Sequence, residues 1–208
     1  FDGESETASI ALQLHVWSFA AWMILLALQA WCASTGRMGL HRQFGLALLP
    51  LALVMLVSAG MSETDLAVRS IAKGNSLNVR AVTYGMLFGF AVFVPMAWFA
   101  RRNPPAHKRL ILMATASIIA GAHFRIWGDW WSEAWFDGSF IGRLLFFWGG
   151  TMIVMTMGII YDLVSRGMLH PVYKIGVPLV LGAQALIIVA FDSEWFDPLI
   201  RPLILAYS

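Results

Sequence analysis

The amino-acid sequence predicts an all-α integral membrane protein in which six transmembrane helices form three hairpins, with both termini outside and short cytoplasmic turns. Composition is the first observation behind this prediction. The chain has 208 residues, of which 59% are hydrophobic and only 12% are charged, and its mean hydropathy is +0.72. A soluble domain of this length cannot bury so much apolar surface, so the surplus is expected to face lipid. The other two observations are six apolar runs and an uneven distribution of basic residues.

The apolar runs cover about residues 9–34, 44–62, 81–100, 108–127, 144–164 and 175–191. A helix rises about 1.5 Å per residue, so runs of this length suit a hydrocarbon core of about 30 Å. Pro50, Pro95 and Pro178 lie inside three of the runs, where neighbouring helices must satisfy the freed carbonyl groups. We treat residues 1–208 as a single transmembrane domain.

Three further segments are expected to lie in the outer interface, at about residues 63–79, 128–143 and 192–208. The first follows a candidate N-cap at Ser62 and is predicted to be a short surface helix. The second contains tryptophans among acidic residues, as interfacial aromatic belts do. The third is too short and too interrupted by proline to span, so it is interpreted as an amphipathic interfacial segment or a docking strip for a partner.

Basic residues decide the predicted orientation, because cytoplasmic connections carry an excess of Lys and Arg. The connections after the first, third and fifth runs hold Arg37, Arg42, Arg101, Arg102, Lys108, Arg109, Arg166 and Lys174. The opposite side holds fewer, namely Arg69, Lys73, Arg80, Arg143 and Arg201. Both termini are therefore expected outside. The small net charge of +2 gives no reason to expect a nucleic-acid partner.

The three predicted cytoplasmic junctions share a pattern: GRMGLHRQFG, RRNPPAHKRL and SRGMLHPVYK each place a histidine four or five residues after an arginine. One interpretation is a divalent metal site made by His41, His107 and His170 with Asp162, the one acidic residue on this side. A second is structural: the histidines cap helix starts, and Asp162 pairs with Arg166 four residues later.

A third interpretation of the same junctions is a binding site for an anionic lipid headgroup or a quinone carbonyl. Arg42, Lys108, Arg109 and Arg166 would supply the positive charge. The three interpretations use overlapping residues, and the spacing of the residues does not decide among them.

Two histidines, His15 and His123, lie within the apolar runs at similar expected depth below the outer interface. This pair is a candidate for ligating a b-type haem, with Arg125 as the cation for the propionates. An arginine inside a membrane span costs about 2.5–3.5 kcal/mol on insertion scales, so it is ordinarily paired or functional. The alternatives are interhelical hydrogen bonds for the histidines and snorkelling to the interface for Arg125.

The run LHVWSFAAWMILLALQAW, followed by GR-x(2)-LHR-x-FG, AHKRLILMATAS and YDLVSRGMLHP, resembles a family of uncharacterised multi-pass bacterial inner-membrane proteins over residues 15–171. This resemblance implies a six-helix protein of a bacterial inner membrane and brings no activity with it. The first run also resembles helices of b561-type membrane cytochromes, which carry a histidine, aromatic residues and a glutamine, although the histidines of this chain are spaced differently. That resemblance implies a haem protein.

Three functions remain open at this point. The first is a non-catalytic membrane subunit, a scaffold or accessory protein of a larger inner-membrane complex, with lipids and other membrane subunits as its partners. The second is an electron-transfer protein that binds haem b or quinone through His15 and His123. The third is a small-solute transporter. The chain contains no Walker motif, nucleophile elbow, HExxH or CxxC, so an enzyme is not expected.

Overall fold

The protein is almost entirely helical. The structure, a computed structural model, describes residues 10–135 and 138–206, and of residues 124–125, 128–129 and 131–135 it describes the backbone alone. Helices make up 88% of the structure and the described residues contain no strand, which confirms the all-α prediction. Within that part of the chain, five helices are long and apolar enough to cross a membrane: Ile10–Ser34, Met38–Ala72, Arg80–Arg102, Phe140–Arg166 and Pro171–Phe191.

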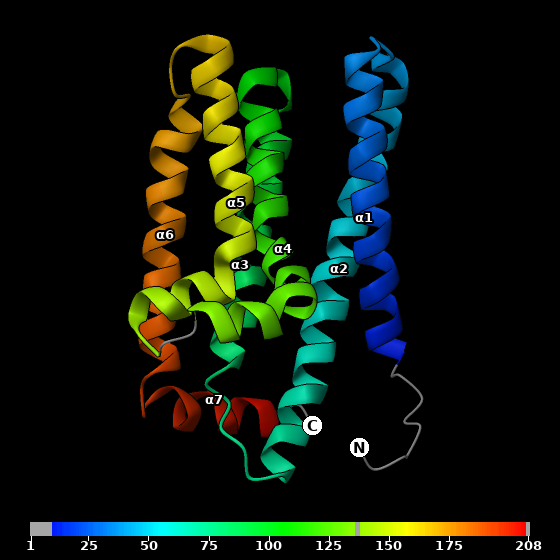
Figure 1. The fold of residues 1–208 in the computed structure, drawn as a ribbon. Coiled ribbons are helices and arrows are strands. Elements are labelled where there is room, and N and C mark those ends of the chain that lie inside the picture. Colours follow the sequence, from blue (N-terminus) through cyan, green and yellow to red (C-terminus); the bar gives the residue numbers. More distant parts are fainter. Residues whose placement is uncertain (1–9, 136–137, 207–208) are drawn as a thin grey trace. The chain divides into compact units, whose positions relative to one another are not determined.

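The chain divides into two compact units, one up to Arg69 and one from Ser70 to Tyr207, and each is described by itself. Unit 1 contains α1 (Ile10–Ser34) and nearly all of α2 (Met38–Ala72). The two helices form an antiparallel hairpin (Figure 1). Gly36 adopts a positive φ of 72° in the turn between them, a conformation that glycine reaches without steric cost. Whether the two units behave as the single domain expected from the sequence stays a prediction.

Helix α2 corrects one expectation. Residues 44–62 and 63–79 were expected to form a membrane span and a separate surface helix, whereas α2 runs unbroken from Met38 to Ala72 over 35 residues. Ser62 lies inside this helix and is buried, so it is not an N-cap. No glycine or proline interrupts the chain between Ser62 and Ala72, and the helix ends only before Gly74, where φ is 72°.

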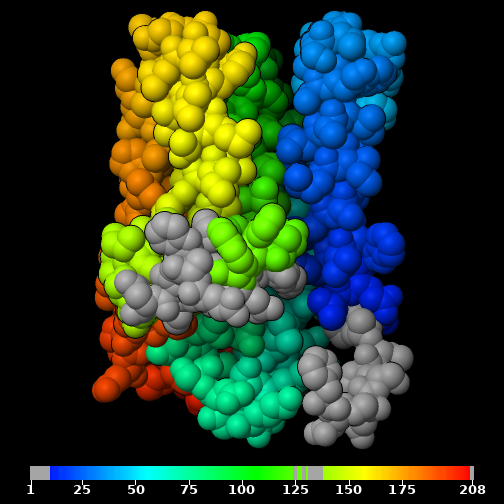
Figure 2. All heavy atoms as spheres, viewed as in Figure 1, coloured from blue at the N-terminus to red at the C-terminus, as the bar shows by residue number. Residues whose placement is uncertain are grey.

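Unit 2 is a four-helix bundle with a fifth helix across one end. Its helices are α3 (Arg80–Phe99), the short η1 (Ala100–Arg102), α4 (Pro104–Trp135), α5 (Phe140–Arg166), α6 (Pro171–Phe191) and α7 (Phe196–Leu205). Helix α4 packs against both α3 and α5, and α6 also contacts both of them. The two hairpins expected here are therefore parts of one bundle, because α4 and α5 pack as closely as α3 and α4 do. Figure 2 shows α4 (green) and α5 (yellow) side by side on one face.

Side chains from α3 to α6 meet in the core of unit 2. Its buried members are Val82, Ala120, Phe147, Trp148 and Ile188. Glycines let the helices approach closely around this core: a Cβ on Gly150 of α5 would lie 2.8 Å from the Cβ of His123, and a Cβ on Gly176 of α6 would lie 2.7 Å from the sulfur of Met113. Small residues at helix contacts are the usual means of close packing in membrane proteins.

Helix α7 runs across the end of unit 2 at which α3 begins and α6 ends (Figure 1). The backbone N–H of Leu77 donates to Oδ2 of Asp197 at 3.1 Å, and the amide of Asn78 donates to the carbonyls of Phe191 and Ser193 at 2.9 and 2.8 Å. These bonds join the connection before α3 to the residues around the start of α7. The expected interfacial segment 192–208 thus contains a docked helix, while residues 207–208 lie outside the described part.

Candidate functional site

A group of ionisable side chains in unit 2 lies where α4 begins and α5 ends. Arg109 of α4 and Asp162 of α5 form an ion pair whose side chains are 2% and 1% exposed. Arg109 Nε donates to Asp162 Oδ2 at 2.8 Å, and Nη2 donates to Oδ1. The remaining guanidinium nitrogen, Nη1, donates to the carbonyl of Pro105 one turn earlier in α4. The pair is bidentate, the geometry in which arginine binds carboxylates most strongly.

His170 joins this pair to α6. Its backbone N–H donates to Asp162 Oδ2 at 3.2 Å, and its ring Nδ1 accepts the backbone N–H of Val172 at 3.2 Å. The residue is therefore the N-cap of α6, with Pro171 at the first helical position. Burial, and then the charges of Arg109 and Arg166, lower the pKa of His170 below its ordinary value. A neutral ring is what the cap requires, because only an unprotonated Nδ1 can accept a hydrogen bond.

Tyr173, in the first turn of α6, completes the group. The guanidinium carbon of Arg109 lies 5.9 Å from the centre of the Tyr173 ring, and Tyr173 itself is buried. Gly158 of α5 leaves the space that the Tyr173 hydroxyl occupies. We name Arg109, Asp162, His170 and Tyr173 the α4–α6 cluster. The charges of Arg109 and Asp162 neutralise each other. The Asp162 carboxylate on α5 accepts hydrogen bonds from Arg109 on α4 and from His170 at the start of α6, so the arrangement is suited to holding α4, α5 and α6 together.

The partner of Asp162 differs from the structural expectation. Pairing with Arg166 was predicted from their spacing, but the carboxylate binds Arg109, and Arg166 is exposed. A buried bidentate contact with an arginine on the neighbouring helix satisfies more hydrogen bonds than an exposed contact along one helix. Spacing along the chain cannot reveal such a pair, because 53 residues separate its members. The available signal was that both residues lie near the cytoplasmic ends predicted for their helices.

The other two junction histidines bind backbone carbonyl groups. His41 is the fourth residue of α2, and its Nδ1 lies 3.2 Å from the carbonyl oxygen of Gln29 in α1. His107 is the fourth residue of α4, and its Nδ1 lies 2.8 Å from the carbonyl oxygen of Ala97 in α3. In both hairpins the second helix therefore hydrogen-bonds back to the end of the first. A protonated Nδ1 is the tautomer that can donate to a carbonyl.

The residues of the predicted metal site are distributed over both units. His41 belongs to unit 1, whereas His107, His170 and Asp162 belong to unit 2. Across the part of the chain that the structure describes, no group of three or more His, Cys, Asp or Glu residues is placed to hold a metal ion. The metal site stays a prediction.

The haem candidates are likewise divided between the units. His15 lies in α1 of unit 1, with its ring 4.3 Å from that of Phe19. His123 lies in α4 of unit 2, buried against Gly150. The side chain of Arg125 lies outside the described residues. Ligation of a haem by this histidine pair stays a prediction.

Of the four residues predicted to meet a lipid headgroup or quinone, three are exposed and one is not. Arg42 is exposed in unit 1, and Lys108 and Arg166 are exposed in unit 2. Arg109 is buried and bonded to Asp162 and Pro105. The guanidinium of Arg109 thus serves the α4–α6 cluster.

A second polar group, at the opposite end of unit 2, was not anticipated from the sequence. Arg201 of α7 binds Asp197 one turn earlier through two hydrogen bonds of 2.8 and 2.9 Å. This contact, followed by the bond from Leu77, lowers the pKa of Asp197. The i,i+4 spacing of Asp197 and Arg201 was the signal that could have indicated the pair, while the bond to Leu77 spans 120 residues and has no local signature.

Comparisons with protein-family models, with curated proteins and with solved structures found no match to this chain.

Proposed function

We propose that this chain is a non-catalytic multi-pass subunit, a scaffold or accessory protein of a larger bacterial inner-membrane complex. The observation that carries the proposal is the α4–α6 cluster, in which Arg109 and Asp162 satisfy each other and the start of α6. Polar groups used in this way stabilise a fold. Large apolar side chains are meanwhile exposed on the candidate spans, including Phe88 of α3, Val164 of α5 and Leu186 of α6, and these fit lipid or neighbouring membrane chains.

The proposal includes six spans with both termini outside. Helix α4 is the sixth span: it packs along α3 and α5, both of which are themselves candidate spans. In unit 2 the α3–α4 and α5–α6 turns lie at one end of the bundle (Figure 1). The excess of Lys and Arg in these turns supports their placement in the cytoplasm.

Cysteine labelling tests this topology, because Cys32 is the chain's one cysteine and is buried. In a Cys32→Ala background, single cysteines replace the exposed residues Ser76, Asn103 and Met168. A membrane-impermeant thiol reagent is expected to label position 76 from outside and the other two only after the membrane is opened. Labelling of positions 103 and 168 in sealed cells would contradict the orientation.

Co-purification tests the subunit role. The tagged chain, expressed at its native level, is cross-linked in its membrane, extracted in a mild detergent and analysed by mass spectrometry. We expect other membrane chains to accompany it in defined ratio. A lone, monodisperse chain in several detergents, without cross-links to other proteins, would refute the role.

The alternative of a haem b or quinone electron-transfer protein predicts a different result from the same sample. Ligation by His15 and His123 would give a Soret absorption band that is lost in His123→Leu, and bound quinone would appear on solvent extraction. The second alternative, small-solute transport, predicts uptake by vesicles that contain the purified chain alone.

A further inference from the structure

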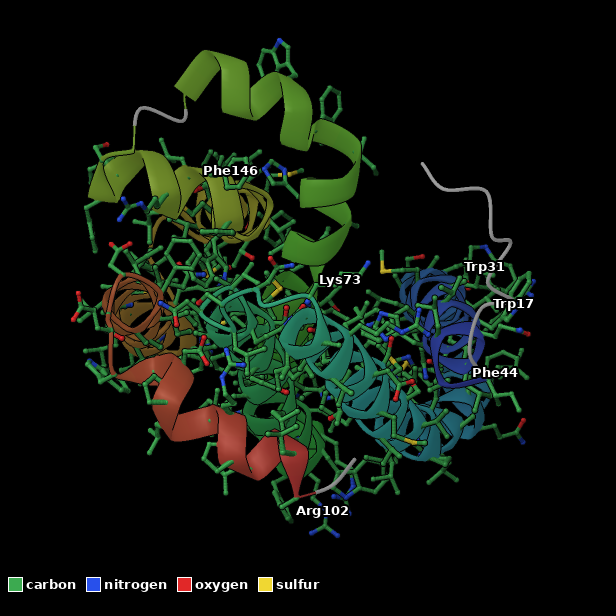
Figure 3. The ribbon with its side chains drawn as sticks, turned by 90° about the horizontal axis from the view of Figure 1, so that it is seen from below. Trp17, Trp31, Phe44, Lys73, Arg102 and Phe146 are labelled. Carbon is green, nitrogen blue, oxygen red and sulfur yellow. The ribbon has the colours of Figure 1, made fainter. Side chains whose placement is uncertain are left out.

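We infer that unit 2 binds the headgroup of an anionic phospholipid at the end formed by the α3–α4 and α5–α6 turns. This surface, which we name the basic end, carries five exposed cationic residues: Arg101, Arg102, Lys108, Arg166 and Lys174. Figure 2 shows the α5–α6 turn at one end of unit 2, and Arg102 extends away from the helices in Figure 3. The inference goes beyond the subunit role and does not depend on any protein partner.

The charge of the basic end is not offset by acidic residues. Asp162 is the one acidic residue in residues 97–109 and 159–177. Its carboxylate is buried and bonded to Arg109 and to the backbone of His170. The α4–α6 cluster therefore pairs the acidic residue with a buried arginine and leaves the exposed cations without a carboxylate among these residues. An anion is the ligand that such a surface attracts.

Two of the cations lie over aromatic rings. The guanidinium carbon of Arg101 lies 4.4 Å from the centre of the Trp98 ring, and Nζ of Lys108 lies 5.2 Å from the centre of the Tyr161 ring. Arg101 also donates to the carbonyl of Trp98 at 3.1 Å. Both contacts lie within the distance at which cation–π attraction operates. Trp and Tyr rings are enriched where membrane helices meet the headgroup layer. Cations in contact with these rings therefore lie at the membrane depth of the lipid phosphodiesters.

Exposed apolar side chains next to the cations identify the anion as a lipid. Phe99 is 79% exposed at the end of α3, and Val164 is 82% exposed near the end of α5. Met168, in the α5–α6 turn, is 62% exposed. A free phosphate or a nucleic acid would make no use of these side chains, whereas the acyl chains of a phospholipid would cover them while its headgroup met the cations.

The test uses the purified full-length chain in detergent, freed of lipid, and native mass spectrometry. Phosphatidylglycerol and phosphatidylcholine with identical acyl chains are added in equal amounts. We expect bound phosphatidylglycerol to exceed bound phosphatidylcholine. The triple variant Arg101→Gln, Arg102→Gln, Lys108→Gln should lose this preference by about fivefold for each cation that meets the headgroup. Lys73→Gln is the control, because Lys73 is exposed at the opposite end of unit 2, and it should keep the preference.

Three results would overturn the inference. The first is equal binding of the two lipids by the unaltered chain, and the second is an unchanged preference in the triple variant. The third is displacement of phosphatidylglycerol by an equal concentration of inorganic phosphate, which would identify a phosphate site. If the triple variant does not fold, the lipid preference of the unaltered chain is measured at two salt concentrations instead. Raising ammonium acetate from about 0.1 M to about 1 M shortens the electrostatic screening length from about 10 Å to about 3 Å. The preference should then fall, and a preference that persists contradicts the inference.

Discussion

Removing Asp162 alone from the Arg109–Asp162 pair should destabilise unit 2 more than removing both residues. In Asp162→Leu, three donors lose their acceptor: the buried Nε and Nη2 of Arg109 and the part-buried backbone N–H of His170. Each buried donor without a partner costs about 1–3 kcal/mol, and an unpaired buried charge costs about 3–5 kcal/mol. We therefore expect Asp162→Leu to lower the free energy of unfolding by about 3–5 kcal/mol.

The two single variants should differ in a defined direction. Arg109→Met leaves a carboxyl group that can bind a proton and become neutral, and that still accepts from His170. Asp162→Leu leaves a guanidinium that stays charged at every accessible pH. Arg109→Met should therefore cost less than Asp162→Leu, and the difference should shrink as pH rises. The double variant replaces the pair by apolar side chains and should cost less than Asp162→Leu alone.

The assay is the free energy of unfolding in mixed micelles, measured by titration with a denaturing detergent and followed by circular dichroism. Asp192→Asn is the control, because it breaks the ion pair between Asp192 and Arg143. The side chain of Arg143 is 26% exposed and that of Asp192 is 38% exposed. Exposed pairs contribute about 0–1 kcal/mol. Strictly additive costs in the double variant, or a cost of Asp162→Leu no larger than that of Asp192→Asn, would refute the reasoning.

Three further predictions concern single positions. Gly158→Ala should lower the free energy of unfolding by about 1–3 kcal/mol, because the added Cβ would lie 2.8 Å from Cδ2 of Leu112 and against the Tyr173 hydroxyl. Gly182→Ala is the control: a Cβ at Gly182 would meet no atom within 4 Å, so this variant should be neutral or stabilising in the same titration. His107→Phe should cost about 1 kcal/mol through loss of the interhelical bond to Ala97, and a cost below the error of the titration would mean that the bond is not formed. His170 should make the free energy of unfolding depend on pH, because its pKa is lower in the folded chain than in the unfolded chain. The stabilisation by His170 is therefore fully present above the pKa of the unfolded chain, about 6.5, and is lost as the pH falls below that value. His170→Asn keeps an N-cap without this titration, so its unfolding free energy between pH 7.5 and pH 5 should fall less than that of the unaltered chain.

The sequence by itself determined the class of protein and the approximate positions of its helices. Composition and the length of apolar runs are local properties, and lipid demands that each spanning backbone satisfy its own hydrogen bonds, so helices follow from hydropathy. The turns that contain Gly36 and Gly167 lie between predicted apolar runs, and in the structure each of these glycines adopts a positive φ. The continuation of α2 past Ser62 was missed, because a serine before acidic residues has the same local pattern inside a helix as at its start.

Only the tertiary structure decided which residues meet. Asp162 has Arg166 within reach on its own helix, yet Arg109 on α4 binds it, because burial between helices favours the partner that satisfies the most hydrogen bonds. The junction histidines look alike in the sequence, but His107 bonds to α3 while His170 caps α6. The difference follows from where each helix begins: His107 lies one turn inside α4, and His170 precedes Pro171, whose missing N–H and fixed φ suit the first position of a helix.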